Sequence, residues 1–249
     1  MILLIDIGNT CLKWATYQSN TLGAVSSLKH RGEDLCVSLE TAFKSLPTPQ
    51  QLWLAHVIDP ARIETIIAWM TARWQILPTV AHSQPQWLGL KNGYIEPARL
   101  GVDRWLGLMG VWSQKKAPFC LISAGTAITI DVVEPEGQHQ GGLILPGWAL
   151  ALTALSTYTY GCQRLTPSVI STDVGPWARE TTAALEGGRT YFYQALFERL
   201  KKDVPSGHID YWLTGGDAEH IRPFLPFSTQ YQPNLVLLGL AAWGESETG

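Results

Sequence analysis

The first half of the chain alternates short apolar runs with turn residues and helical spacings. An apolar run over 2–7 ends at Gly8-Asn9, and a second run over 11–18 follows at once, so this pattern predicts a β-hairpin. Further along, the same reasoning predicts a helix over 31–46 and a strand over 51–57. A second helix, over 59–74, is expected to start at an Asp-Pro N-cap, and residues 81–100 are expected to form an extended loop.

The second half repeats this order. Apolar runs predict a strand over 119–123 and its hairpin partner over 127–133. We then expect a strand over 141–145, a helix from 148 and a long helix over 177–202. A strand over 209–213 and a closing helix over 235–243 are expected to follow. One apolar face of the long helix is expected from Leu185, Phe192, Leu196 and Leu200. The repeat predicts an α/β fold with an internal duplication, divided into halves 1–116 and 117–249.

Composition narrows the class of protein. Of 249 residues, 46% are hydrophobic and 16% charged, which is an ordinary globular balance. The net charge is −3 and no strongly basic cluster is present, so nucleic acid is not an expected partner, because phosphate neutralisation needs a concentrated basic face. The cysteines lack CxxC spacing, which favours reduced thiols over disulfides or a metal site; they are Cys11, Cys36, Cys120 and Cys162.

Neither a signal peptide nor a membrane span is expected. Asp6 interrupts the first apolar run, and no basic region precedes it. Residues 141–163 carry no charge, but Gly141, Pro146 and Gly147 interrupt them before an apolar span reaches roughly twenty residues. We therefore expect a soluble cytoplasmic protein with no membrane contact.

One phrase occurs twice, about half a chain apart: LIDIGNT at 4–10 and LISAGTA at 121–127. No Walker A or GxGxxG sequence occurs, so phosphates would need another device. Hairpin turns with glycine and small hydroxyl residues are such a device, because glycine lets backbone N–H groups approach phosphate oxygens. Two such hairpins facing each other across a cleft would hold a triphosphate, with Asp6 placed for Mg²⁺ and Lys13 for a phosphate.

Either hairpin alone is more simply an ordinary turn, since single short motifs are weak signals. A third glycine turn, TGGD at 214–217, follows an expected strand and precedes a helix, which is a natural place for an adenosine. Together the three turns favour nucleotide binding.

The motif set resembles the acetate and sugar kinase, Hsp70 and actin superfamily, whose fold is two duplicated ribonuclease-H-like domains with a nucleotide cleft between them. Within it, the sequence closely resembles the type III pantothenate kinases. The matching segments, in family order, are residues 6–14, 94–105, 124–131, 141–147 and 214–217. The resemblance implies ATP-dependent phosphorylation of pantothenate to 4'-phosphopantothenate, the first step of coenzyme A biosynthesis, with Mg²⁺ and a homodimer.

The resemblance also assigns roles to residues. Asp103 corresponds to the catalytic aspartate that takes the proton of the pantothenate hydroxyl; from the residues alone, a favourable charge at a helix N-terminus explains it equally well. The ATP-binding residues would be Asp6, Ile7, Gly8, Asn9, Thr10, Cys11, Leu12, Lys13 and Thr126, with Asp6 also a Mg²⁺ ligand. The substrate-binding residues would be Tyr94, Gly101, Val102, Asp103, Arg104 and Thr181.

Several of these assignments have simpler alternatives. Arg104 suits a substrate carboxylate but would serve as well in a surface salt bridge, and Tyr94 by itself is a loop aromatic. Thr181 is placed through a segment in which Glu180 replaces the family's usual asparagine, so a helix-surface threonine remains an alternative. The uncharged stretch 141–162, with Trp148, Tyr158 and Tyr160 expected to be exposed, is a candidate dimer face.

Ser123 departs from the family pattern, which has an aspartate there that helps to hold a monovalent cation, potassium or ammonium. Serine is neutral, so a weaker site built from carbonyls, a cation-independent enzyme or an impaired enzyme are the alternatives. The presence of Asp6, Lys13, Asp103 and Thr126 argues against impairment. Two other functions are alternatives: a regulatory or accessory protein without turnover, and a kinase for another small alcohol, which the segment 94–104 disfavours.

Overall fold

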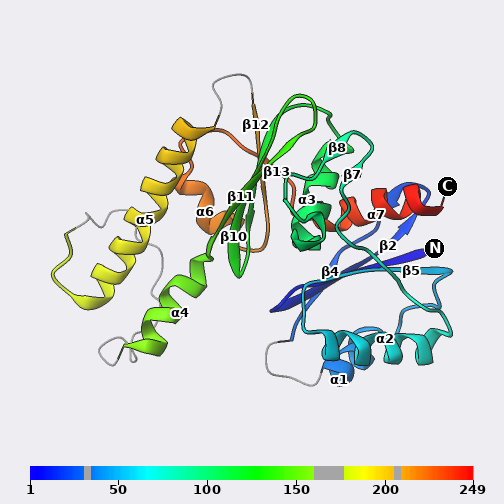
Figure 1. Ribbon diagram of the computed structural model, residues 1–249. Helices are drawn as coiled ribbons and strands as arrows, with labels where there is room; N and C mark the ends of the chain where they lie inside the picture. The colour runs from blue at the N-terminus through cyan, green and yellow to red at the C-terminus, as the bar shows by residue number, and fades with distance from the viewer. Residues whose placement is uncertain (31–34, 160–176, 205–208, 249) are drawn as a thin grey trace. The chain divides into compact units, whose positions relative to one another are not determined.

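The computed structural model describes residues 1–30, 35–159, 177–204 and 209–248 (Figure 1). The chain forms two compact units. The first unit contains Met1–Ala117, Val133–Gly141 and Asn234–Gly249, and the second contains Pro118–Val132 and Gly142–Pro233. The expected halves 1–116 and 117–249 therefore differ from these units, because the last helix and residues 133–141 pack with the first unit.

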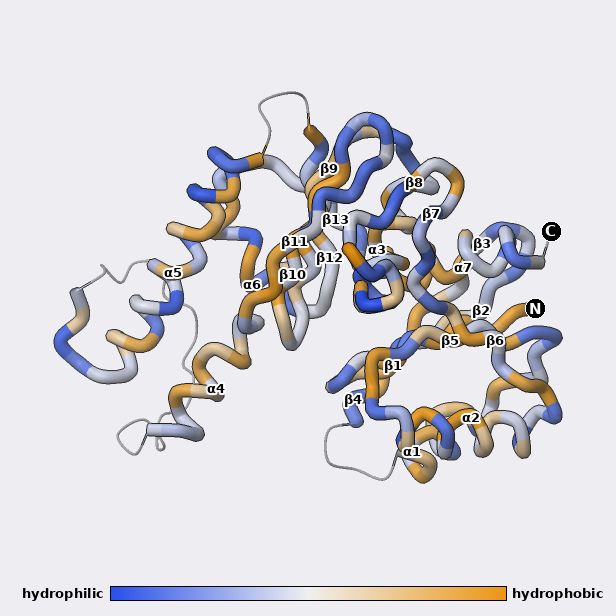
Figure 2. The backbone as a smooth tube through the Cα atoms, in the orientation of Figure 1, coloured by the Kyte–Doolittle hydropathy of each residue, from blue (hydrophilic) through white to orange (hydrophobic). Residues whose placement is uncertain are grey.

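The first sheet has the strand order β3-β2-β1-β5-β6, with β4 paired to β2. Its strands are β1 (Ile2–Ile7), β2 (Cys11–Gln18), β3 (Thr21–Leu22), β4 (Ser26–Lys29), β5 (Gln51–His56) and β6 (Thr79–Val80). β1 runs antiparallel to β2 and parallel to β5. The predicted hairpin is confirmed, and Figure 2 shows β1 and β5 as hydrophobic segments.

Helices cover both faces of this sheet, because alternate side chains of a strand point to opposite faces. Leu3, Ile5 and Leu54 pack in one core with α1 (Leu35–Ala42) and α2 (Pro60–Trp74). On the other side, α3 (Val102–Trp112) and α7 (Leu235–Thr248) contact the same sheet and each other. α3 and α7 approach closely at Gly239, where an added Cβ would lie 1.9 Å from the Leu106 carbonyl oxygen.

The second sheet repeats the connectivity of the first. Its strands, in the order β11-β10-β9-β12-β13, are β11 (His139–Pro146), β10 (Ala127–Val133), β9 (Phe119–Ala124), β12 (Asp210–Thr214) and β13 (Gln230–Tyr231). In each sheet a hairpin is followed by a strand that pairs in parallel with the first hairpin strand. The predicted α/β fold with an internal duplication is confirmed by this common order.

The second unit places its helices around this sheet. They are α4 (Trp148–Tyr158), α5 (Thr181–Asp203), α6 (Ala218–Ile221) and the short 3₁₀ helix η3 (Arg222–Phe224). Tyr193 and Phe197 of α5 join Ile122 and Leu213 of the sheet in one core. The expected extended loop 81–100 contains a two-stranded hairpin, β7 (Gln86–Trp87) and β8 (Leu90–Lys91), and the 3₁₀ helix η1 (Pro97–Arg99).

Two helix predictions need correction. The first helix covers Leu35–Ala42 rather than 31–46, and residues 31–34 lie outside the described part of the chain. The long helix begins at Thr181. Of its expected apolar face, Leu200 is buried and Leu196 packs against the core, but Phe192 is 46% exposed, whereas its neighbour Tyr193 is buried. Two adjacent aromatic residues permit either register, and the Tyr193 hydroxyl selects one by donating to the Pro146 carbonyl at 2.7 Å.

Three predictions about thiols, membranes and exposure can be compared with the structure. Cys11, Cys36 and Cys120 are free thiols, as expected, and Cys162 lies outside the described residues. None of the described helices has the length and apolar character that a bilayer crossing requires. The expected exposure of Trp148 is wrong, because this side chain is buried beneath α5 and α6, as described below.

Candidate active site

The first hairpin turn joins β1 to β2 through Gly8-Asn9-Thr10, and the Gly8 N–H donates to the Cys11 carbonyl at 3.0 Å. Ile7 and Leu12 flank the turn with fully buried side chains. Of the expected ATP-binding residues, these two can therefore offer only their backbone to a ligand.

Asp6 lies at the end of β1, directly opposite Lys13 on β2. Burial and the negative charge of Asp103 raise the pKa of Asp6 to about 7, and the positive charge of Lys13 opposes this rise. Asp6, Lys13 and Asp103 are thus brought together within the first unit, although Asp103 lies almost a hundred residues away in the sequence.

Two neighbouring carboxylates repel each other, and a divalent cation relieves that repulsion. Among the described residues, however, no group of three or more His, Cys, Asp or Glu side chains is placed to hold a metal ion. Asp6 matches the coordination preference of Mg²⁺, which binds through one or two carboxylates and completes its octahedral shell with water and substrate phosphates. The residues present therefore suit a metal that arrives with a nucleotide.

Asp103 is the second residue of α3, directly after Val102, and Gly101 caps this helix. One Asp103 carboxylate oxygen, Oδ1, accepts a hydrogen bond from the Arg104 backbone N–H at 2.8 Å. A Cβ at Gly101 would lie only 2.7 Å from that oxygen. The glycine therefore leaves room for the carboxylate in its observed position.

Arg104 is buried, with 7% of its surface exposed, so the alternative of a surface salt bridge is wrong. It donates from Nη1 to the Tyr94 hydroxyl at 2.6 Å, and its Cζ lies 5.4 Å from the centroid of the Tyr94 ring. The other contact of that ring is His139, a buried residue whose ring is nearly parallel at 6.3 Å. A guanidinium held this firmly is suited to bidentate recognition of a carboxylate.

The second hairpin turn, Gly125-Thr126, joins β9 to β10 and carries the exposed Thr126. The Gly147 N–H donates to the Thr126 carbonyl at 2.9 Å and so connects this turn to the start of α4. Ser123, one strand position before Ala124, is paired with Thr214 on β12. Ser123 is therefore held against the strand that leads into the third glycine turn, and Thr126 is held against the start of α4.

That third turn packs directly on the hairpin. The Asp217 N–H donates to the Ala124 carbonyl at 3.0 Å. Gly215 has a φ of +100°, and an added Cβ would lie 2.0 Å from the same carbonyl oxygen, so only glycine fits here. As expected, the turn follows a strand, β12, and precedes a helix, α6.

Trp148 follows Gly147 and is enclosed between the Arg189 guanidinium and the His220 ring. The Arg189 guanidinium lies 3.6 Å from the centroid of the Trp148 ring and donates from Nη1 to the Trp148 carbonyl at 3.2 Å. The His220 ring stacks on Trp148 at 6.2 Å. Burial lowers the pKa of Arg189. This stack ties α4, α5 and α6 together beside the third glycine turn.

Thr181 is the first residue of α5 and is exposed. Glu180 precedes it as the N-cap, and its carboxylate accepts from the backbone N–H groups of Thr182 at 3.0 Å and Ala183 at 3.1 Å. These hydrogen bonds lower the pKa of Glu180. Asparagine and acidic residues both accept such bonds, so Glu180 preserves a helix start where the sequence resemblance expects asparagine. A substrate role for Thr181 stays a prediction.

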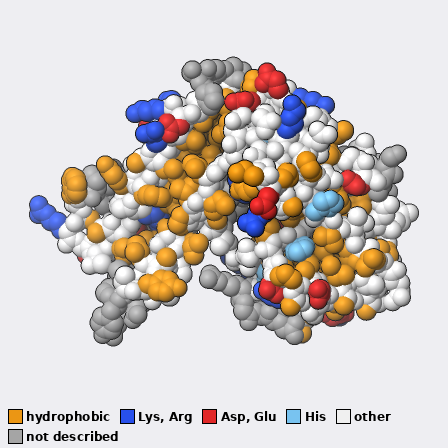
Figure 3. All heavy atoms as spheres, viewed as in Figure 1, with side chains coloured by type: hydrophobic (Ala, Val, Ile, Leu, Met, Phe, Trp, Pro, Cys, Tyr) orange, Lys and Arg blue, Asp and Glu red, His pale blue; other side chains and the backbone are white. Residues whose placement is uncertain are grey.

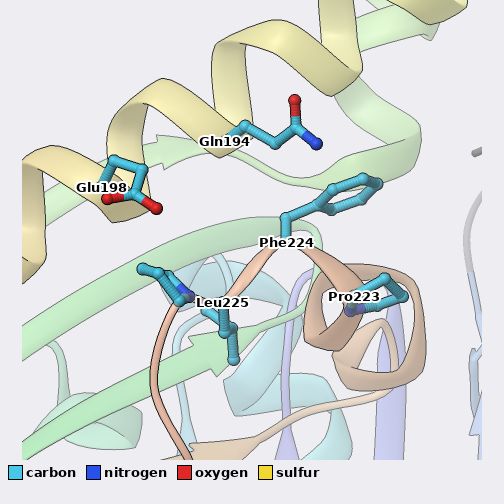
Figure 4. A pocket seen from close by; sticks show the side chains of 6 residues that line it. Gln194, Glu198, Pro223, Phe224 and Leu225 are labelled. Carbon is cyan, nitrogen blue, oxygen red and sulfur yellow. The ribbon is translucent and has the colours of Figure 1, made fainter.

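Sequence reasoning missed two buried histidines beside these residues. His139 stacks on Tyr94, and His30 donates to the first hairpin turn. Both lie beside polar residues or glycine, SSLK before His30 and QGG after His139, so hydrophobic periodicity carried no signal for them. A hollow between α5 and η3, lined by Gln194, Glu198 and Phe224 among others (Figure 4), contains none of the expected site residues.

Comparison with known proteins identifies the class first. Solved structures of other proteins share this fold. A Sinorhizobium meliloti protein named as a 2-dehydro-3-deoxygalactonokinase has this fold with a TM-score of 0.57, at 12% identity over 99% of both chains. A Campylobacter jejuni protein named for the Baf family of transcriptional activators has a TM-score of 0.63, at 20% identity over 99% of this chain and 98% of that one. At these identities the likeness concerns the fold alone.

The sequence itself identifies the family. Residues 2–203 match the type III pantothenate kinase family. The type III pantothenate kinase of Nitrosococcus oceani is 34% identical over 97% of this chain and 92% of its own. That of Burkholderia cenocepacia is 33% identical over 96% and 93%. The chain therefore belongs to the type III pantothenate kinase family, which confirms the expected enzyme class, a kinase.

Proposed function

We propose that this chain transfers the γ-phosphoryl group of ATP to the primary hydroxyl of pantothenate, giving 4'-phosphopantothenate and ADP, the first step of coenzyme A biosynthesis. The observation that carries the proposal is the gathering of Asp6, Lys13 and Asp103 in one unit, at the end of the glycine hairpin of a kinase family. Phosphoryl transfer needs mainly alignment and neutralisation of charge, and these residue types supply both.

Asp103 is the proposed catalytic base. Its carboxylate takes the proton of the pantothenate hydroxyl as the new O–P bond forms, and the bond from the γ-phosphorus to the bridging oxygen of ADP breaks. The position of Asp103 at the start of α3 beside Gly101 leaves its carboxylate uncrowded. A base must lie within hydrogen-bond reach of the proton it removes, and the segment 94–104 supplies both that base and the groups that bind the substrate.

Arg104 and Tyr94 are the proposed anchors of pantothenate. The buried guanidinium would pair with the substrate carboxylate, and Tyr94 would fix its orientation through the 2.6 Å hydrogen bond and the ring contact. Gly101 and Val102 are proposed to line the same turn, and Thr181 to contribute from α5.

ATP is proposed to bind at the glycine turns. Backbone groups of residues 7–12 and the side chain of Lys13 are proposed to hold its phosphates, and Thr126 is also proposed to contact ATP. Asp6 would hold Mg²⁺, which supplies charge neutralisation for the transferred phosphoryl group.

A monovalent cation is proposed to bind more weakly here than in a protein with aspartate at position 123. Ser123 offers a neutral hydroxyl, and a neutral ligand attracts a cation less than a carboxylate does. Potassium or ammonium would therefore act only at a higher concentration.

The enzyme is proposed to be a cytoplasmic homodimer. In the second unit, β11, α4 and α5 expose large apolar side chains: Leu143, Ile144, Leu155, Tyr158, Tyr191 and Phe192. Figure 3 shows apolar side chains gathered over the part of the molecule that contains these elements. Exposed apolar surface of this kind favours burial against another chain.

Tyr160 of the expected dimer face lies outside the described residues. Light scattering of the purified protein tests the dimer directly.

The function is tested by supplying pantothenate and Mg-ATP to the purified protein and measuring phosphopantothenate by mass spectrometry. The proposal expects product, and it expects a large loss of product in Asp103→Asn. An accessory protein without turnover predicts no product from a folded protein that still binds ATP. Pantothenate also competes with any other alcohol substrate, which separates this kinase from one for a different small alcohol.

A further inference from the structure

His30 lies directly behind the first hairpin turn. It follows β4, and its side chain is fully buried. Its Nε2 is 2.9 Å from the Gly8 carbonyl oxygen, and its backbone N–H donates to the Thr10 carbonyl at 3.1 Å. One residue therefore binds two carbonyl groups of the turn that is expected to hold phosphate.

The chemistry of these bonds fixes their direction. A carbonyl oxygen only accepts, so Nε2 of His30 carries the hydrogen in the bond to Gly8. A trans peptide unit holds its C=O and its N–H on opposite sides. With the Gly8 and Thr10 carbonyls directed at His30, the N–H groups of Asn9 and Cys11 point away from it.

The peptide unit after Gly8 needs a contact that fixes its orientation. Glycine adopts several backbone conformations at little cost, so the peptide unit after Gly8 has little intrinsic preference for one orientation. A donor on the far side of that peptide selects one of them. Among the described residues, Nδ1 of His30 is buried without a hydrogen-bond partner, a desolvation cost that an apolar residue of similar size would avoid. The imidazole thus contributes more than packing.

We propose that His30 is a positioning residue for nucleotide binding: it holds the peptide units of the first hairpin so that their N–H groups face the phosphates of ATP. It does not touch the reacting atoms. The inference rests on the proposed function in one respect, that this hairpin binds the nucleotide.

The test compares three variants. His30→Leu removes the donor, His30→Gln keeps an amide N–H at a similar reach, and His82→Leu changes an exposed histidine of the same unit as a control. Calorimetry gives the dissociation constant for Mg-ADP, and steady-state kinetics give KM for ATP and for pantothenate. Losing one hydrogen bond predicts a weakening of nucleotide binding by about fivefold in His30→Leu, with KM for pantothenate within about twofold of wild type. His30→Gln and His82→Leu are expected to bind nucleotide as wild type does.

Thermal unfolding checks that each variant is folded. If His30→Leu does not fold, His30→Asn, whose side chain is too short to reach Gly8, takes its place. The inference is overturned if the folded variant without the donor, His30→Leu or His30→Asn, binds Mg-ADP with unchanged affinity. It is also overturned if the KM values for ATP and pantothenate rise equally in that variant and both stay raised in His30→Gln. Because Mg-ADP binding requires no turnover, a wild-type protein that binds nucleotide but makes no phosphopantothenate would overturn the proposed function and leave this inference standing.

Discussion

Arg104 donates a 2.6 Å hydrogen bond from Nη1 to the hydroxyl of Tyr94, and so joins the start of α3 to the loop before it. The guanidinium is buried, and the Tyr94 ring is in turn stacked on His139. This arrangement orients Arg104, the one arginine among the expected substrate-binding residues, although Tyr94 lies in a loop and not in a helix or strand.

Tyr94→Phe keeps the ring contact and removes the hydroxyl acceptor. Because the guanidinium loses a hydrogen bond that orients it, KM for pantothenate is expected to rise by about three- to tenfold with a smaller change in kcat. Steady-state kinetics at saturating ATP measure this. Tyr231→Phe is the matched control, since that tyrosine also lies near an arginine, with Arg222 Cζ 4.9 Å from its ring, but outside the expected site. An unchanged KM in Tyr94→Phe would contradict the anchoring role.

Gly101→Ala introduces a Cβ at 2.7 Å from Oδ1 of Asp103, so the carboxylate has to move. A displaced base predicts a fall in kcat of about tenfold or more, whereas the melting temperature changes little because the neighbour is a side-chain end rather than backbone. Gly188→Ala is the control, because Gly188 lies on α5 and an added Cβ there would meet no other atom within 4 Å. Equal kcat values for Gly101→Ala and wild type would show that the position of Asp103 is not critical.

Asp6→Asn is expected to abolish activity and yet stabilise the metal-free protein. The folded-state pKa of Asp6 is about 7 against an ordinary value of 3.8, so between about pH 4 and 7 the folded state holds a proton that the unfolded state has lost. The contribution of this carboxyl to stability therefore falls as the pH rises through that window. At pH 8 in EDTA, the variant is expected to be more stable by about 1–2 kcal/mol, because asparagine carries no charge to bury beside Asp103.

Urea unfolding of both proteins at pH 4 and pH 8 measures the difference. The stabilisation should be present at pH 8 and small at pH 4, where the carboxyl is largely protonated in the folded state. A variant that is less stable than wild type at pH 8 would mean that the attraction between Asp6 and Lys13 outweighs burial and repulsion.

Ser123→Asp restores the carboxylate that the resemblance expects. The added charge should lower the potassium concentration for half-maximal activity by about five- to tenfold, because a carboxylate binds a cation more strongly than a hydroxyl. Kinase assays across a potassium series, with Ser123→Ala as the neutral control, measure this. If aspartate and alanine give the same potassium dependence, position 123 takes no part in cation binding.

The sequence predicted the parts of the fold that depend on local chemistry. Asp59 was expected to cap a helix, and it accepts from the Ala61 N–H at 2.9 Å at the start of α2. The hairpins and glycine turns were located for the same reason, since glycine and small polar residues favour turns through their own local conformational preferences. The repeated strand order then followed from the repeated pattern.

Features that depend on distant contacts were not predictable in this way. The choice between Phe192 and Tyr193 as the buried residue depends on the Pro146 carbonyl, more than forty residues away. Trp148 resembles an exposed aromatic in an uncharged segment until Arg189 and His220 enclose it. His30 follows the short polar strand β4, and its contact with Gly8 becomes visible only when β4 pairs with β2.

The most direct test of the central claim is the rate of phosphopantothenate formation by wild type and Asp103→Asn, with Mg-ADP affinity measured in parallel. We expect product from wild type and a fall in kcat of about 10²- to 10⁴-fold in the variant, with nucleotide affinity retained, as removal of a catalytic base predicts. A variant that keeps wild-type kcat, or a folded wild-type protein that binds nucleotide and forms no product, would contradict the account.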